Sequence, residues 1–100
     1  MLDSAQQGLV VAVYEAELPA EQSAALRQAY AAALDRGIPS EIIQTFLVPG
    51  PAEGAPWRLV VVWGSRRALE AYREANALPG VAIFRAAGSE PRQSVAGLAS

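Results

Sequence analysis

The stretch that most constrains the fold of this chain runs from Trp57 to Trp63, because it is apolar on both of its faces. Its valines and tryptophans are typical of a β-strand. Successive side chains of a strand point to opposite sides. One side of this strand carries Trp57, Leu59, Val61 and Trp63, and the other carries Val60 and Val62, with Arg58 as its polar residue at the strand end. A sheet with one face in water should alternate apolar with polar residues, so we expect this strand to be covered on both faces.

Further strands are predicted at residues 8–17, 41–48 and 81–85, which are rich in valine, isoleucine or phenylalanine. The segment Pro49–Pro56 contains three prolines and two glycines, so it predicts a loop. The tail from Ser89 holds a proline and small residues. We expect this tail either to be loose or to add one short strand.

Two helices are expected between these strands. Pro19 suits the first turn of a helix, and Gly37 suits the residue that follows a helix end. Apolar residues recur at helical spacing between them, at Leu26, Tyr30, Ala33 and Leu34. A second helix is expected over residues 66–77, with Ser65 as its N-cap and Pro79-Gly80 as its end.

The predicted order β-α-β-β-α-β indicates an α+β, ferredoxin-like fold in a single domain over residues 1–100, with a core over about 8–91. Right-handed crossovers then give a four-stranded antiparallel sheet in the order 4-1-3-2, with both helices on one face. The other face measures roughly 440 Å² in projection. We expect a second copy to cover it in a homodimer packed sheet on sheet, the alternative being a monomer that tolerates an apolar face.

Composition excludes several classes of site. The chain has no cysteine and no histidine, and all eight of its basic residues are arginines. Thiol, imidazole and Schiff-base chemistry are therefore excluded, and we expect no metal and no cofactor. The net charge of −2 argues against nucleic acid as a partner. The N-terminal residues do not resemble a signal peptide, and no apolar run is long enough to cross a membrane, so a cytoplasmic location is expected.

Three stretches of this sequence resemble a known family. They are Leu18-Pro19-Ala20-Glu21, the run from Trp57 to Tyr72 with its Trp63-Gly64-Ser65 turn, and Val81–Arg85 continuing into Glu90-Pro91. Together they are similar to the antibiotic-biosynthesis-monooxygenase-like branch of the dimeric α/β-barrel superfamily, over about residues 8–91. The resemblance implies a homodimer with a pocket between sheet and helices in each subunit. Characterised members oxidise aromatic or quinol substrates with O₂, without metal or flavin, and others degrade haem or isomerise lactones.

The resemblance also bears on individual residues. In the quinone-forming members an Asn and a Trp hold the substrate, and Trp63 matches that Trp by motif. No Asn matches its partner, since Leu59 is apolar and Asn76 lies late in the second helix. The haem-degrading members need an axial histidine, which this chain lacks.

Four residues are candidates for substrate binding: Trp63, Tyr30, Tyr72 and Arg85. Trp63 could stack on a flat ring, and the two phenols could relay a proton, although packing in the core explains all three as well. Arg85 could place a charge at a pocket mouth or pair with Glu15 on a neighbouring strand.

Arg66 and Arg67 begin the second helix, where cations oppose the helix dipole. They either meet an anionic group of a ligand or partner, or form a solvated pair in which Arg66 reaches Glu70.

Two functions follow as hypotheses. The first is a cofactor-independent monooxygenase or isomerase that acts on a small apolar or aromatic metabolite. The second is a non-catalytic dimeric protein of the same fold that binds a small ligand or serves as an accessory protein.

Overall fold

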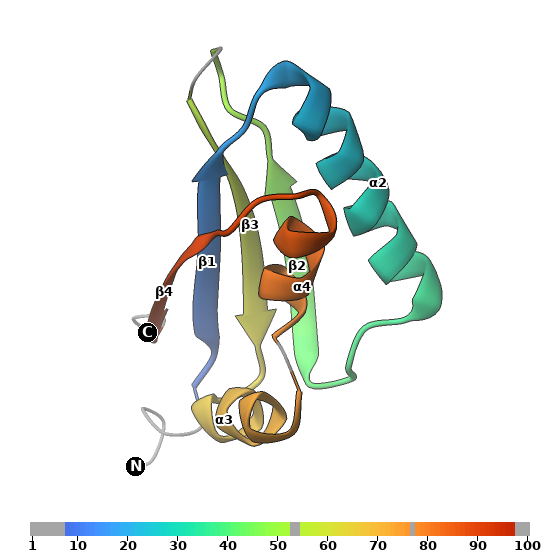
Figure 1. Cartoon of the computed structure of the whole chain (residues 1–100). Coiled ribbons are helices and arrows are strands. Elements are labelled where there is room, and N and C mark those ends of the chain that lie inside the picture. Colours follow the sequence, from blue (N-terminus) through green and yellow to red (C-terminus); the bar gives the residue numbers. More distant parts are fainter. Residues whose placement is uncertain (1–7, 53–54, 77, 98–100) are drawn as a thin grey trace.

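The computed structural model describes residues 8–52, 55–76 and 78–97 and contains one four-stranded antiparallel sheet (Figure 1). Its strands are β1 (Val10–Glu17), β2 (Ile42–Val48), β3 (Pro56–Trp63) and β4 (Arg92–Gly97). They lie in the order β2-β3-β1-β4, which confirms the predicted 4-1-3-2 topology. The α+β, ferredoxin-like fold is therefore confirmed.

The helices are α2 (Ala20–Arg36), α3 (Arg66–Ala75) and α4 (Pro79–Ala86). Both α2 and α4 lie over one face of the sheet and contact each other, while α3 lies at the end of the sheet where β3 stops (Figure 1). Ser65 is the N-cap of α3 as predicted, since its hydroxyl accepts a hydrogen bond from the Ala68 amide at 3.1 Å. None of the described helices is long and apolar enough to cross a membrane.

The prediction of a strand at residues 81–85 is wrong, because this segment belongs to α4. Pro79 stands in the first turn of this helix, where a missing amide hydrogen costs nothing, so it starts the helix. Gly80, Ile83 and Phe84 are buried at the i, i+3, i+4 spacing of a helix face. The fourth strand is instead formed by the tail, as β4, in the position beside β1.

The core lies between the sheet and the helices. Its largest fully buried side chains include Trp63, Tyr14 and Phe84. Helix α4 comes very close to β1 at Gly80, where an added Cβ would lie 2.3 Å from Cδ2 of Tyr14. Only glycine allows this approach, so Gly80 sets how deeply α4 sits on the sheet.

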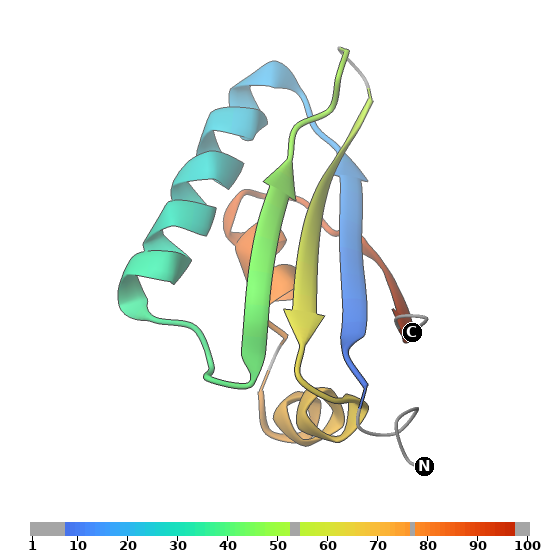
Figure 2. The same ribbon diagram turned by 180° about the vertical axis from the view of Figure 1, so that it is seen from behind.

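The opposite face of the sheet is not covered by any described helix (Figure 2). Strand pairing places six apolar side chains on it: Val11, Val13, Phe46, Val48, Val60 and Val62. Phe46 remains 50% exposed and Val48 42% exposed. The sequence-based expectation that both faces of this sheet are apolar is therefore met.

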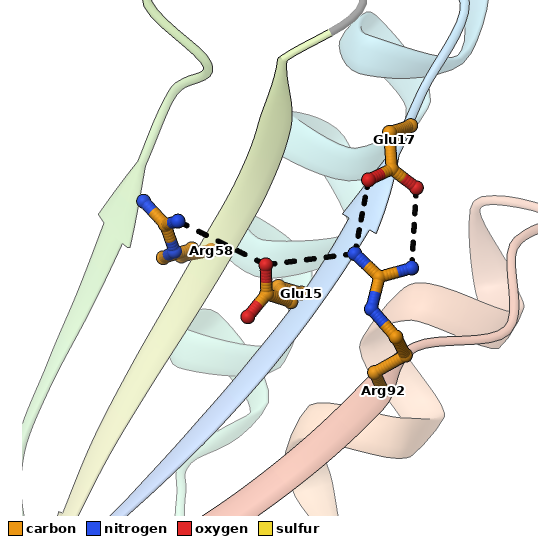
Figure 3. Close-up of polar contacts among 4 residues, drawn as sticks. All are labelled: Glu15, Glu17, Arg58 and Arg92. Atoms are coloured by element: carbon orange, nitrogen blue, oxygen red, sulfur yellow. Dashed lines mark hydrogen bonds and ion pairs between the residues drawn. The ribbon is translucent and has the colours of Figure 1, made fainter.

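One end of the open face is charged (Figure 3). Arg92 of β4 lies 3.0 Å from Glu17 and 3.5 Å from Glu15, and Arg58 of β3 lies 3.8 Å from Glu15. The hydrogen bond from Arg92 lowers the pKa of Glu17 below its ordinary value. This charged row crosses three strands, β4, β1 and β3, and Val48 of β2 lies beside it.

Candidate functional site

The described residues form a groove between α2 and α4, with a volume of about 510 Å³. Its walls come from the second half of α2, the loop that follows, and the length of α4. Tyr72 of α3 forms part of the wall. The groove is partly open to solvent and lies on the helix side of the molecule.

Small side chains create this groove. The α2 wall includes Ala25, Ala29, Ala32 and Ala33, and the α4 wall includes Ala82 and Ala86. Alanine side chains are too short to fill the space beside two neighbouring helices, so a hollow remains where they line it. Ile38, Pro39 and Ile83 add larger apolar surface.

Few polar groups reach the groove. Gln28 and Arg36 of α2 line it, together with Tyr72. None of the described lining residues carries a carboxylate. The groove is therefore a partly open hollow whose walls combine small apolar side chains with an amide, a guanidinium and an aromatic ring.

Tyr72 is the one predicted site residue that lines the groove, and Trp63 lies directly behind it. The two rings pack with centroids 5.6 Å apart and planes at 53°. The Trp63 side chain is completely buried, and its indole Nε1 has no hydrogen-bond partner among the described residues. Trp63 therefore supports the wall and is not one of the residues that line the groove.

Tyr30 and Arg85 lie elsewhere. The Tyr30 hydroxyl is 2.8 Å from Oγ1 of Thr45, so it links α2 to β2 and does not line the groove. Arg85 is exposed on α4 and forms an ion pair with Glu90 at 2.9 Å. The four predicted residues are thus not gathered into one site.

The expected pair of Arg85 with Glu15 is wrong, because Arg85 lies on a helix and Glu15 pairs with Arg92 and Arg58 across the sheet. The expected pair of Arg66 with Glu70 is also not formed among the described contacts, since Glu70 pairs with Arg73 on the following turn. Arg66 and Arg67 are exposed at the start of α3.

A further buried phenol belongs to Tyr14 of β1. Its hydroxyl is buried without a hydrogen-bond partner among the described residues. Burial raises the pKa of Tyr14 to about 12, and the charge of Arg73 opposes this rise only in part. Tyr14 therefore keeps its proton at neutral pH and does not serve as a base.

Sequence reasoning missed Arg36 and Gln28, which line the groove. They are ordinary polar residues on a helix and carry no motif. The available signal was the series of alanines on the side of α2 that faces α4, but residues 81–85 of α4 were predicted as a strand.

No protein-family model matches this chain, and no curated protein is similar to it in sequence. Solved structures do share its fold. A protein from Caulobacter crescentus described as a "putative antibiotic biosynthesis monooxygenase" superposes with a TM-score of 0.67 at 16% identity, covering 96% of this chain and 94% of that one.

Two other solved structures are similar over most of their lengths. A conserved protein from Methanosarcina mazei gives a TM-score of 0.70 at 9% identity, with 96% of this chain and 98% of that chain covered. A conserved protein from Bacteroides thetaiotaomicron, described as of unknown function and a "possible oxidoreductase", gives 0.58 at 11% identity, with 94% and 98% covered. At these identities the similarity concerns architecture, so the chain has the ferredoxin-like α+β fold that these proteins share.

Proposed function

We propose that this protein is a homodimeric binding protein that holds a small apolar or aromatic molecule in the groove between α2 and α4. The observation that carries the proposal is the groove itself, about 510 Å³ in volume and lined mainly by alanines, Ile38, Ile83 and the ring of Tyr72. Ligand sites commonly have volumes of about 300–1,000 Å³, apolar walls and a few polar groups that fix orientation. The groove has a volume in this range, alanine and isoleucine side chains on its walls, and the polar groups of Gln28, Arg36 and Tyr72.

Binding is better supported than catalysis. The chain has no histidine, and the described groove residues include no carboxylate, so an evident general base is missing. Tyr14 holds its proton, since burial raises its pKa to about 12. Trp63 supports the groove from behind and does not line it.

The dimer is the second part of the proposal. The open sheet face carries apolar side chains, among them Phe46 and Val48, that are half exposed in one subunit. Two sheet faces of roughly 440 Å² would bury about 900 Å² in total, near the lower bound of a specific interface before loops contribute. A second copy is the occupant with a matching apolar face, and a two-fold axis brings the two faces together.

Filling the groove tests the binding function. We expect naphthol to shift the amide NMR signals of groove residues in α2 and α4 selectively, and Ala32→Phe to remove this response by occupying the groove. Ala31→Phe is the matched control, because Ala31 is exposed on the same helix but does not line the groove. Shifts scattered over the surface, or equal binding by both variants, would contradict the proposal.

A cofactor-independent monooxygenase is the second candidate function. It is favoured by the fold shared with the Caulobacter crescentus protein and by the Trp63–Tyr72 ring pair at the groove wall. In such a reaction a phenol becomes a quinone. One atom of O₂ enters the ring, the other leaves as water, and all electrons come from the substrate.

Oxygen uptake tests this second candidate. Dihydroxynaphthalene in the presence of the protein should consume O₂ faster than without it, and Ala32→Phe should abolish the difference. An uptake equal to the uncatalysed rate, in a sample that binds naphthol, would leave binding alone as the function.

A further inference from the structure

The groove has an unequal distribution of charge. Among the described residues that line it, Arg36 is the only cation and there is no anion. Arg36 lies in the last turn of α2, next to the loop residues Gly37 and Ile38 that close this end of the groove. One end of the groove is therefore lined by a cationic side chain.

Among the described residues, Arg36 has neither a carboxylate nor an aromatic ring as a partner, whereas most other arginines of the chain have one. Ion pairs engage Arg58, Arg73, Arg85 and Arg92. The guanidinium of Arg27 lies 4.8 Å from the ring centroid of Trp57. The described part of the chain offers Arg36 no carboxylate within 4.0 Å, so its guanidinium can accept an external anion. Arg66 and Arg67 also have no such pair there, but neither lines the groove.

The end of α2 does not cancel this charge. The carbonyl groups at a helix C-terminus act as roughly half a negative charge, which is about half of what a guanidinium carries. Asp35 lies in the same last turn but does not line the groove, so among the described lining residues this end presents the charge of Arg36 alone. A single guanidinium suits one carboxylate, which it can bind through two parallel hydrogen bonds, whereas a doubly charged phosphate would be only half neutralised.

We infer that the groove selects an apolar molecule that bears one carboxylate, with its rings or chain along the alanine walls beside Tyr72 and its carboxylate on Arg36. This inference rests on the proposed binding function. It adds the chemical class of the ligand and names Arg36 as the residue that binds its carboxylate. Gln28 lines the same groove and supplies an amide for a second polar group of the ligand.

The test compares two ligands that share a naphthalene ring, one bearing a carboxylate and the other a neutral hydroxymethyl group. Isothermal titration calorimetry should show that naphthoate binds more tightly than naphthylmethanol, and added salt should weaken the binding of naphthoate alone. In Arg36→Gln, naphthoate should bind about three- to tenfold more weakly while naphthylmethanol is unaffected.

Arg66→Gln is the matched control, since it removes one exposed arginine that does not line the groove. It should retain the preference for naphthoate. Circular dichroism confirms that both variants are folded.

The outcomes separate this inference from the function on which it rests. Equal affinity of wild-type protein for both ligands, or a preference for naphthoate that survives Arg36→Gln, would overturn the inference while binding in the groove stands. Failure of both ligands to bind would overturn the inference together with the proposed binding function.

Discussion

Gly80 controls the closest approach between a helix and the sheet. A Cβ at this position would lie 2.3 Å from Cδ2 and 2.4 Å from Cε2 of Tyr14, which is far inside van der Waals contact. We expect Gly80→Ala to push α4 away from β1 and to lower the free energy of unfolding by about 1–3 kcal/mol, as overpacked cores do. Urea denaturation measures this change.

Gly97→Ala provides the comparison for Gly80→Ala, because an added Cβ at Gly97 meets nothing within 4 Å. Its effect on the free energy of unfolding should stay within about 0.5 kcal/mol. Equal effects of the two substitutions would show that α4 is not held against Tyr14 in the way described.

Tyr14 makes stability sensitive to alkaline pH. Burial raises the pKa of Tyr14 from 10.0 to about 12, so the folded state retains a proton that the unfolded state loses. The stability linked to Tyr14 is complete below about pH 10 and is lost as pH rises toward 12. Two units of pKa correspond to roughly 2–3 kcal/mol. The chain has no lysine side chain that titrates over the same range.

Tyr14→Phe should remove most of this alkaline loss. At neutral pH it should leave the stability unchanged or raise it slightly, because the buried hydroxyl has no hydrogen-bond partner among the described residues. Urea denaturation at about pH 8 and pH 11 measures both effects. A variant as sensitive to alkali as the wild-type protein would disprove the role of Tyr14.

At the scale of elements, most of the fold could be predicted from local signals. Strands β1, β2 and β3 follow from valine- and isoleucine-rich stretches, and α2 follows from Pro19, Gly37 and its spacing of apolar residues. The segment after Pro79 was wrongly predicted as a strand, since a short apolar run is compatible with a strand or a buried helix. Its buried residues at i, i+3 and i+4 become meaningful only once Gly80 is known to contact Tyr14.

The candidate site was predictable only in part, for a related reason. Tyr72 was identified because an aromatic residue stands out on an inward helix face. Arg36 was not, because its role depends on how α2 and α4 face each other, and residues distant in sequence determine that arrangement. The groove is lined by alanines of α2 and α4, and in the sequence these alanines are indistinguishable from ordinary helix-forming residues.

Strand β4 is held to β1 partly by charge. The hydrogen bond from Arg92 lowers the pKa of Glu17, so this contact is present above the ordinary carboxyl pKa of 4.5 and is lost as pH falls through the lowered value. Arg92→Gln should return the pKa of Glu17 toward 4.5, measured by NMR titration of the side-chain carboxyl. Arg58→Gln is the control, because Arg58 contacts Glu15 and not Glu17. A pKa of Glu17 that stays low in Arg92→Gln would refute the assignment.

At the scale of the whole molecule, the open face of the sheet is the surface on which we place the proposed dimer contact. Val61 and Val62 are adjacent in β3 but face opposite sides, with Val61 only 1% exposed beneath the helices and Val62 on the open face. A charge at the two positions should therefore act in different ways. Val61→Asp places an unpaired carboxylate in the core and should unfold the chain, whereas Val62→Asp should leave each subunit folded.

Sedimentation of wild-type protein should give twice the 10.5 kDa mass of one chain, and Val62→Asp should give the single mass with an unchanged circular dichroism spectrum. Ala31→Asp adds the same charge to an exposed position on α2, away from the sheet, and should remain dimeric. A wild-type mass of one chain would mean that the apolar face is tolerated in water. A dimer that survives Val62→Asp would place the contact on another surface, because two facing carboxylates cannot be buried without partners at the centre of an apolar interface.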